Sequence, residues 1–233
     1  MSEPVRAAGG GWKLSLVAAL LGVLIGAGAM FLASGQFVRS YLLDHPEVIP
    51  EAMERLRSRE MANAVGQNRA AFETPFHSAW AGAADGDVVL VEFYDYACGF
   101  CRTSNADIER LMREDPRLKV VWREYPVLGP GSEQAAVASL AAARAGRFRQ
   151  FHDGLFGAGR PTPENVTRVS QSVGLGAAEL TDEFRREIQR NYELARAIGA
   201  NGTPVFIVGD QVFHGAVGYE TLKAAIATAR AAS

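Results

Sequence analysis

Two cysteines, in the motif Cys98-Gly99-Phe100-Cys101, carry the most chemically informative pattern in the sequence. Thiols three residues apart can close into a small disulfide ring and open again. The first thiol lies where a helix is predicted to begin, and the unpaired N–H groups and dipole of a helix start favour negative charge. Thiols in such places have pKa values of about 3.5–7.5 instead of about 8.5. We therefore predict that Cys98 is a nucleophile and that Cys101, one turn further along and buried, resolves a mixed disulfide.

Other uses of two cysteines fit the sequence less well. A zinc site needs two more ligands, and a haem attachment site needs histidine where Arg102 stands. A permanent disulfide in so small a ring adds little stability. The histidines show no paired spacing; they are His45, His77, His152 and His214. We expect no resident metal and no organic cofactor, and we keep a copper(I)-binding dithiol protein of the cell envelope as the alternative. A holdase with incidental cysteines is a third class.

Length and composition limit the other possibilities. The chain has 233 residues, of which 48% are hydrophobic and 21% charged, and its net charge is −2. These values are typical of one or two folded domains and exclude a largely disordered chain. Because no basic surplus exists to neutralise phosphates, we expect no nucleic-acid partner.

The N-terminal region contains a long apolar stretch. Residues 14–33 carry no charge and follow Arg6 and Lys13, and about 20 apolar residues suffice to cross a bilayer. We predict an uncleaved inner-membrane anchor over residues 14–34, with residues 1–13 in the cytoplasm. A signal sequence cleaved near Ala33 is the alternative. Both interpretations place the rest of the chain in the periplasm, where disulfides persist.

The remaining pattern alternates strands and helices. Residues 88–96 and 118–126 are predicted strands, and a helix over 98–113 between them implies a parallel pair. A helical region over residues 130–200 follows. Two further strands meet at a Gly209-Asp210 turn, and the last helix covers about 218–230. Residues 73–87 have the composition of a linker, so we predict a catalytic domain over 76–233.

Residues 35–75 form a predicted helical segment with a narrow apolar stripe. Ile49, Met53 and Leu56 follow one another at helical spacing, and Val65 and Phe72 continue the stripe after a slip. Such a stripe must be covered. The segment either packs on the main domain or pairs with copies of itself as an oligomerisation stalk.

Two sequence stretches resemble a known family. EFYDYACGFC and, about 100 residues later, NGTPVFIVG are similar to the DsbA family of thiol–disulfide oxidoreductases, and YLLDHPEVIPEAMERL is similar to its ScsC-like and Com1-like branch. The resemblance covers residues 37–233. It implies an α/β thioredoxin fold with an inserted helical domain, here preceded by the membrane helix and the helical segment.

The resemblance also implies roles for single residues. Cys98 and Cys101 match the redox pair, and Pro204 matches a cis-proline opposite it. Thr203, before that proline, would hydrogen-bond an extended substrate chain. Glu92 matches a buried carboxylate that exchanges a proton with Cys101, and Asp95 is a second candidate for this role.

The dipeptide Gly99-Phe100 matches a position that contacts substrate in the family. Its Gly-aromatic type is similar to that of disulfide isomerases and ScsC-like proteins. Strong oxidases of the family have Pro-His there, and a cationic histidine favours the thiolate further. The dipeptide therefore leaves open whether this chain acts as an oxidase or as an isomerase or reductase.

The implied function is a periplasmic enzyme that forms, reduces or isomerises disulfides. Its implied substrates are unfolded or misoxidised exported proteins. A DsbB-like membrane protein would reset an oxidase, and a DsbD-like one would reset an isomerase or reductase. The branch also implies a homo-oligomer joined through residues 36–72.

Overall fold

The computed structural model describes the backbone of residues 11–232 and their side chains except at 11–15, 29 and 31–34. The chain divides into two compact units, residues 1–56 and 57–233. The first unit contains helix α1 (Gly11–Asp44) and the start of helix α2 (Val48–Glu73). A short break at Pro46 separates these helices, in keeping with the missing N–H and fixed φ of proline.

The predicted membrane anchor falls within α1. Among the helices that the structure describes, none combines the length and the apolar character needed to span a bilayer. The anchor over residues 14–34 is therefore not confirmed. Most of the predicted cytoplasmic segment 1–13 lies outside the described residues.

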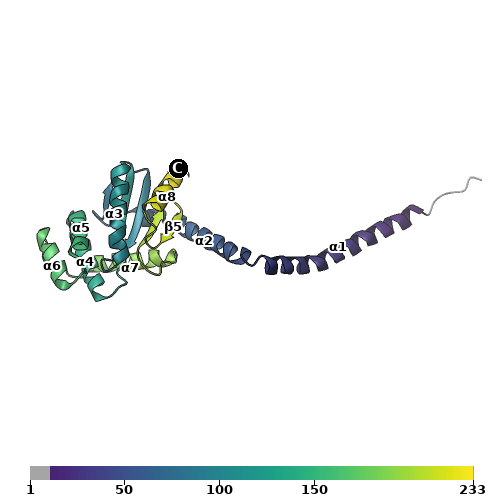
Figure 1. The fold of residues 1–233 in the computed structure, drawn as a ribbon, viewed down its shortest axis with the longest axis horizontal. Coiled ribbons are helices and arrows are strands. Elements are labelled where there is room, and N and C mark those ends of the chain that lie inside the picture. The colour runs from purple at the N-terminus through teal and green to yellow at the C-terminus, as the bar shows by residue number, and fades with distance from the viewer. Residues whose placement is uncertain (1–10, 233) are drawn as a thin grey trace, which may run out of the picture. The chain divides into compact units, whose positions relative to one another are not determined.

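The second unit follows the predicted alternation of strands and helices (Figure 1). Its elements after α2 are β1 (Trp80–Gly82), β2 (Val88–Tyr94), α3 (Gly99–Glu114), β3 (Leu118–Glu124), α4 (Pro130–Arg144), α5 (Phe148–Ala158), α6 (Pro163–Ser172), α7 (Asp182–Ala197), β4 (Val205–Val208), β5 (Gln211–His214) and α8 (Tyr219–Ala232). Helices α4 to α7 lie between β3 and β4 in the chain, where the insertion was predicted. Of these, α4, α5 and α6 pack on one another.

The strands form one mixed sheet in the order β1-β3-β2-β4-β5. Strands β2 and β3 are parallel, with Glu92 opposite Trp122 and Tyr94 opposite Glu124. Strand β4 is antiparallel to β2 and to β5, and Gly209-Asp210 makes the predicted turn between β4 and β5. This is the α/β sheet expected of a thioredoxin fold.

The sheet includes one strand that the sequence did not predict. Strand β1 lies inside residues 73–87, which have the composition of a linker, and pairs antiparallel with β3. It has only three residues and sits at the edge of the sheet, so its sequence shows no alternating pattern. The linker prediction is therefore wrong for Trp80–Gly82.

Both faces of the sheet are covered by helices. One core contains even-numbered residues of β2 and β3 together with side chains of α3, α4, α5 and α8. The other contains Val91, Phe93 and Val121 together with side chains of α2 and α7. Because successive strand residues point to opposite faces, the nearly continuous apolar runs of β2 and β3 can fill both cores.

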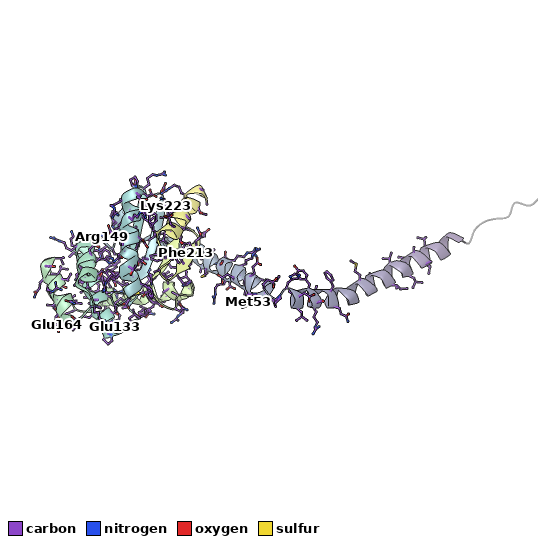
Figure 2. The ribbon with its side chains drawn as sticks, viewed as in Figure 1. Met53, Glu133, Arg149, Glu164, Phe213 and Lys223 are labelled. Atoms are coloured by element: carbon purple, nitrogen blue, oxygen red, sulfur yellow. The ribbon has the colours of Figure 1, made fainter. Side chains whose placement is uncertain are left out.

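The apolar stripe of α2 is exposed in its first part and buried in its second part. Val65 and Phe72 are buried in the second core, whereas Ile49, Met53 and Leu56 are exposed. Figure 2 shows the side chain of Met53 projecting from the helix. The later part of the stripe therefore packs on the main domain, and the earlier part has no cover within the described chain.

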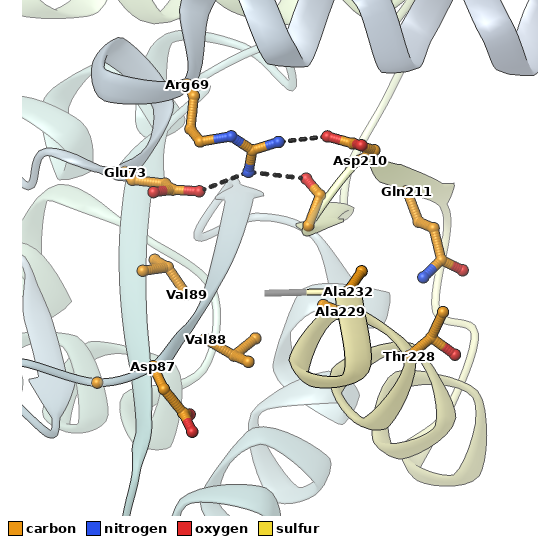
Figure 3. Close-up of a pocket in the computed structure, with 12 residues that line it drawn as sticks. Arg69, Glu73, Asp87, Val88, Val89, Asp210, Gln211, Thr228, Ala229 and Ala232 are labelled. Atoms are coloured by element: carbon orange, nitrogen blue, oxygen red, sulfur yellow. Dashed lines mark hydrogen bonds and ion pairs between the residues drawn. The ribbon is translucent and has the colours of Figure 1, made fainter.

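An arginine holds α2 to the β4–β5 turn. Arg69 donates hydrogen bonds to Glu73 at 2.9 Å and to the Gly209 carbonyl at 3.3 Å, and it also pairs with Asp210 (Figure 3). These residues line a pocket of about 500 Å³ that also contains Val88. Because Val88 begins β2, this pocket lies at the opposite end of the strand from the cysteines.

Candidate active site

Three chain segments meet at the carboxyl end of β2. The cysteine motif follows β2, the loop 125–129 follows its parallel neighbour β3, and Thr203-Pro204 precedes its antiparallel neighbour β4. The carboxyl edge of an α/β sheet is where sites of this fold class are usually built. The topology therefore brings together cysteines and a proline that are about 100 residues apart in the sequence.

Cys98 occupies the N-cap of α3. Its sulfur accepts a hydrogen bond from the Cys101 backbone N–H at 3.3 Å, and its thiol donates to the Thr203 carbonyl at 3.3 Å. A hydrogen bond from the Cys101 side chain and the backbone N–H groups of the first helical turn lower the pKa of Cys98 to about 5. At neutral pH this group is therefore a thiolate, as a nucleophile requires, and the bond to the Thr203 carbonyl forms only when the thiol is protonated.

Cys101 has the opposite environment. Its side chain is fully buried, and burial, followed by the hydrogen bond to Cys98 and the charge of Glu92, raises its pKa far above the ordinary thiol value. The two cysteines are both free thiols in this structure. One turn of helix thus separates an acidic thiol, whose residue is 5% exposed, from a completely buried thiol that keeps its proton.

The bond between Thr203 and Pro204 is cis, as predicted. The Pro204 carbonyl accepts a hydrogen bond from Gly215 N–H at 2.8 Å, which ties this loop to the end of β5. The Thr203 side chain is half-buried, and its hydroxyl has no hydrogen-bond partner within the described chain. The structure therefore brings Thr203 and Pro204 to Cys98, as the sequence analysis expected.

Glu92 is a buried carboxyl group beneath the cysteines. It is completely shielded from solvent, and neither of its oxygens has a hydrogen-bond partner among the described residues. Burial raises the pKa of Glu92 to about 8, and the Cys98 charge adds to this, while the indole of Trp122 acts in the opposite direction. Glu92 is therefore largely protonated at neutral pH and lies close enough to Cys101 to influence that thiol.

Asp95 has a different environment from the one predicted. Its carboxylate accepts backbone N–H groups from Ala97 at 2.8 Å and from Val127 and Leu128 at 2.9 Å each. Its own carbonyl accepts the Cys98 N–H at 3.0 Å. With both oxygens engaged by backbone groups, Asp95 acts as a structural link between two loops, and Glu92 is the better candidate for proton exchange.

The structure contains a second buried glutamate that was not predicted from the sequence. Glu124 is almost fully buried on the same face of the sheet as Glu92 and accepts a hydrogen bond from the Tyr94 hydroxyl. Burial raises the pKa of Glu124 to about 8. Ser139 and His152 extend this polar cluster into α4 and α5 through the Tyr96 hydroxyl, at 2.9 and 3.4 Å. The only signal in the sequence is that Glu124 closely follows the apolar run of β3, as the seventh and last residue of that strand.

The dipeptide between the cysteines faces solvent. Gly99 is exposed with open space around it, and Phe100 exposes 68% of its surface. In the described part of the chain, no three histidine, cysteine, aspartate or glutamate side chains gather as metal ligands would. The exposed Phe100 ring therefore provides an apolar surface beside the two thiols.

Comparison with known families gives two matches. Residues 89–227 match the family described as DSBA-like thioredoxin domain, and residues 35–62 match the copper resistance protein ScsC N-terminal domain. The first match covers β2 to α8 and includes every predicted site residue. The second covers the exposed part of α2 and the end of α1, and it contains no cysteine.

Solved structures agree with these matches. A thioredoxin-like oxidoreductase from Silicibacter pomeroyi is 38% identical with a TM-score of 0.67, over 71% of this chain and 99% of that one. A linker-deletion mutant of Proteus mirabilis ScsC is 25% identical with a TM-score of 0.73, over 98% of this chain and all of that one.

Curated relatives include proteins of different length. The Na(+)/H(+) antiporter NhaA 3 of Salinispora tropica is 27% identical over 65% of this chain, but the chain spans only 24% of that antiporter. Disulfide bond formation protein D of Bacillus subtilis is 26% identical over 62% of this chain and 73% of that protein. Since the family match covers more than half of the sequence and the fold agrees with it, the chain belongs to the DSBA-like thioredoxin-domain family.

Proposed function

We propose that this protein is a periplasmic thiol–disulfide oxidoreductase that forms, reduces or isomerises disulfides in exported proteins. The observation that carries the proposal is the opposite environment of two thiols one helical turn apart. Cys98 is acidic and hydrogen-bonded at a helix start, and Cys101 is buried and protonated. A nucleophile and a resolving thiol need this difference, whereas a permanent disulfide does not.

The reaction follows from these environments. In the reducing direction, the Cys98 thiolate attacks one sulfur of a substrate disulfide, and the other substrate sulfur leaves as a thiolate. Cys101 then gives its proton to Glu92 and attacks the Cys98 sulfur, which releases the second substrate thiolate. Two electrons pass from the dithiol to the substrate. The oxidising direction reverses these steps, and no further cofactor enters.

Substrate binding is assigned to the surroundings of Cys98. We propose that Thr203 aligns an extended substrate chain beside Pro204, and that Gly99 and Phe100 contact the same substrate. A Cβ built at Gly99 would meet open space, so a substrate chain can approach the motif there without a steric obstacle. Unfolded or misoxidised proteins fit such an open site because they can present an extended segment.

The redox state of the pair in cells tests the direction of the reaction. Acid quenching followed by a mass-shifting maleimide measures the reduced fraction of Cys98 and Cys101. A mostly oxidised pair would identify an oxidase reset by a DsbB-like protein, and a mostly reduced pair would identify an isomerase or reductase reset by a DsbD-like protein. A pair that stays unchanged when the redox state of the cell envelope is altered would contradict the proposal.

Copper(I) binding by the dithiol receives less support. The match to the copper resistance protein ScsC lies in residues 35–62, away from both cysteines. Copper(I) prefers thiolates, and the buried Cys101 strongly favours its protonated form. The environment of the pair therefore favours thiol exchange over metal capture.

The proposed location and assembly come from the N-terminal region. We propose that residues 14–34 hold the protein at the inner membrane or direct its export, so that the catalytic unit lies in the periplasm. We further propose that the exposed stripe of Ile49, Met53 and Leu56 joins protomers. Exposed apolar stripes at helical spacing favour pairing of helices.

Removing the exposed stripe should lower the oligomeric state. A chain of residues 57–233 keeps Val65 and Phe72, which belong to its core, and should have the mass of a monomer. A chain of residues 36–233 should have the mass of two or more protomers, as measured by multi-angle light scattering. A variant of the longer chain with Met53→Gln and Leu56→Gln tests the stripe at constant length. The same number of protomers in all three proteins would contradict this assembly.

A further inference from the structure

A pocket of about 450 Å³ lies where the end of α7, the end of β5 and one stretch of α2 come together. Its walls include Arg196 and Asn201 from α7 and the loop that follows it, His214 from β5, and Arg57 from α2. All of these residues belong to the second compact unit, residues 57–233. The pocket is therefore part of the same unit as the cysteine pair.

Two short stretches of chain place this pocket next to the nucleophile. Asn201 lines the pocket and lies two residues before Thr203, whose carbonyl is 3.3 Å from the nucleophilic sulfur. On another wall, His214 directly precedes Gly215, whose N–H donates a hydrogen bond to the Pro204 carbonyl. Two residues of chain span at most about 7 Å. The pocket therefore begins within that distance of the backbone that is proposed to align substrate.

The charges in the pocket favour an anion. Arg57 and Arg196 are exposed, and neither side chain forms an ion pair or a hydrogen bond with a residue that the structure describes. Among the lining residues the one acidic side chain is Glu60, which is also exposed and bonds to neither arginine. The chain as a whole has a net charge of −2, so two unpaired guanidinium groups in one pocket create a local positive field.

We propose that Arg57 and Arg196 form an anion subsite that binds the carboxylate of an acidic side chain two or three residues from the cysteine of a substrate protein. This inference deepens the proposed function and rests on it. A guanidinium group presents paired N–H donors whose geometry matches the two oxygens of a carboxylate. An extended chain advances about 3.3 Å per residue, so an acid at this spacing reaches the pocket when its cysteine lies beside Thr203.

Two synthetic peptides test the preference for an acidic substrate. Each carries one cysteine as a mixed disulfide with uncharged 2-mercaptoethanol, and the second and third positions on both sides of it are Asp in one peptide and Asn in the other. The reduced full chain is mixed with excess peptide, and acid-quenched samples give the rate at which the peptide disulfide is lost. At low ionic strength the Asp peptide should half-saturate the protein at about a fivefold lower concentration, with an unchanged limiting rate.

Salt and matched variants show whether the two arginines cause this preference. It should fall below about twofold at about 0.5 M NaCl, because exposed charges are then screened. A variant with Arg57→Gln and Arg196→Gln should lose the preference and keep the wild-type rate with the Asn peptide. A variant with Arg185→Gln and Arg186→Gln removes the same charge from exposed side chains of α7 outside the pocket, and it should behave like the wild type. Glutamine keeps a helix propensity close to that of arginine.

The outcomes distinguish this inference from the proposed function. If the wild-type protein exchanges with neither peptide, the proposed function is wrong. If both peptides half-saturate the wild type at the same concentration, or if the Arg57 and Arg196 variant keeps the preference, only the anion subsite is wrong. A preference that both double variants lose equally would assign the effect to the overall charge of the protein and would also overturn the subsite.

Discussion

Replacing Cys98 with serine should reduce thiol–disulfide exchange at least about a thousandfold, because a serine hydroxyl at this position cannot form a thiolate or a disulfide. The environment that lowers the pKa of Cys98 to about 5 cannot ionise an alcohol to a useful extent. The expected loss therefore appears in kcat/KM with every disulfide substrate. Reduction of insulin, followed by turbidity or by trapping of free thiols, measures it.

Cys101→Ser is the matched control for this experiment. It retains the nucleophile and removes the thiol that resolves the mixed disulfide, so covalent complexes with substrate should accumulate and be visible in non-reducing gels. Cys98→Ser should form no such complexes. Mixed disulfides trapped equally well by both variants would mean that Cys101 is also an accessible nucleophile, contrary to its complete burial. Full activity in Cys98→Ser would instead favour a holdase with incidental cysteines.

The different environments of the two thiols explain why Cys98 reacts with the substrate first and Cys101 second. A thiolate at Cys98 is stabilised before any substrate arrives, so attack does not wait for proton removal. Burial opposes the ionisation of Cys101, so we expect this thiol to lose its proton only after the mixed disulfide has formed, when it attacks the Cys98 sulfur. The helix start supplies the first property, and burial one turn later supplies the second.

Local patterns explain why the cysteines and their helix could be predicted. A Cys-x-x-Cys motif after an apolar strand places the first thiol at a helix start through neighbouring residues alone. Pro204 and Glu92 were inferred from the family resemblance. The structure places Thr203, directly before Pro204, against Cys98, and places Glu92 near Cys101. Glu92 lies within β2 and Pro204 directly precedes β4, so both positions follow from the order of the strands along the chain.

Other features depend on residues far apart in the sequence. The partners of Asp95 are backbone groups at positions 127 and 128, which no pattern near Asp95 could reveal. In α2, Val65 and Met53 belong to one apolar stripe, yet only Val65 is buried. Strand β1 forms by pairing with the edge of β3, and its three residues are too few to show the alternating pattern that predicts a strand.

Glu92→Gln should slow the step in which Cys101 resolves the mixed disulfide by about a hundredfold, because an amide cannot accept the Cys101 proton. Glutamine has the same size, so the packing beneath the cysteines is retained. As general base, Glu92 must be ionised, and its pKa is raised to about 8. The wild-type rate of this step should therefore rise with pH and level off above about pH 8. The Gln variant should lack this inflection, as stopped-flow release of substrate thiol would show.

The free energy of unfolding reports on the ionisation of Glu92 independently of the enzyme's activity. The pKa of Glu92 is raised in the folded state, so the folded protein binds this proton more tightly than the unfolded chain does. The resulting contribution to the free energy of unfolding is fully present below the unfolded pKa of about 4.5 and is lost as the pH rises through about 8. Relative to wild type, Glu92→Gln should gain stability on the order of 5 kcal/mol between these limits, measured by urea unfolding.

Glu124→Gln is the control that separates the effect on the resolving step from the effect on folding stability. Its pKa is also raised to about 8 by burial, so its stability should change with pH in the same direction. Glu124 contacts the Tyr94 hydroxyl rather than the cysteines, and its substitution should leave the resolving step unchanged. An equal loss of resolution in both variants would mean that buried charge at this face of the sheet, and not proton transfer by Glu92, controls Cys101. A loss confined to Glu92→Gln requires a specific proton acceptor beneath the pair.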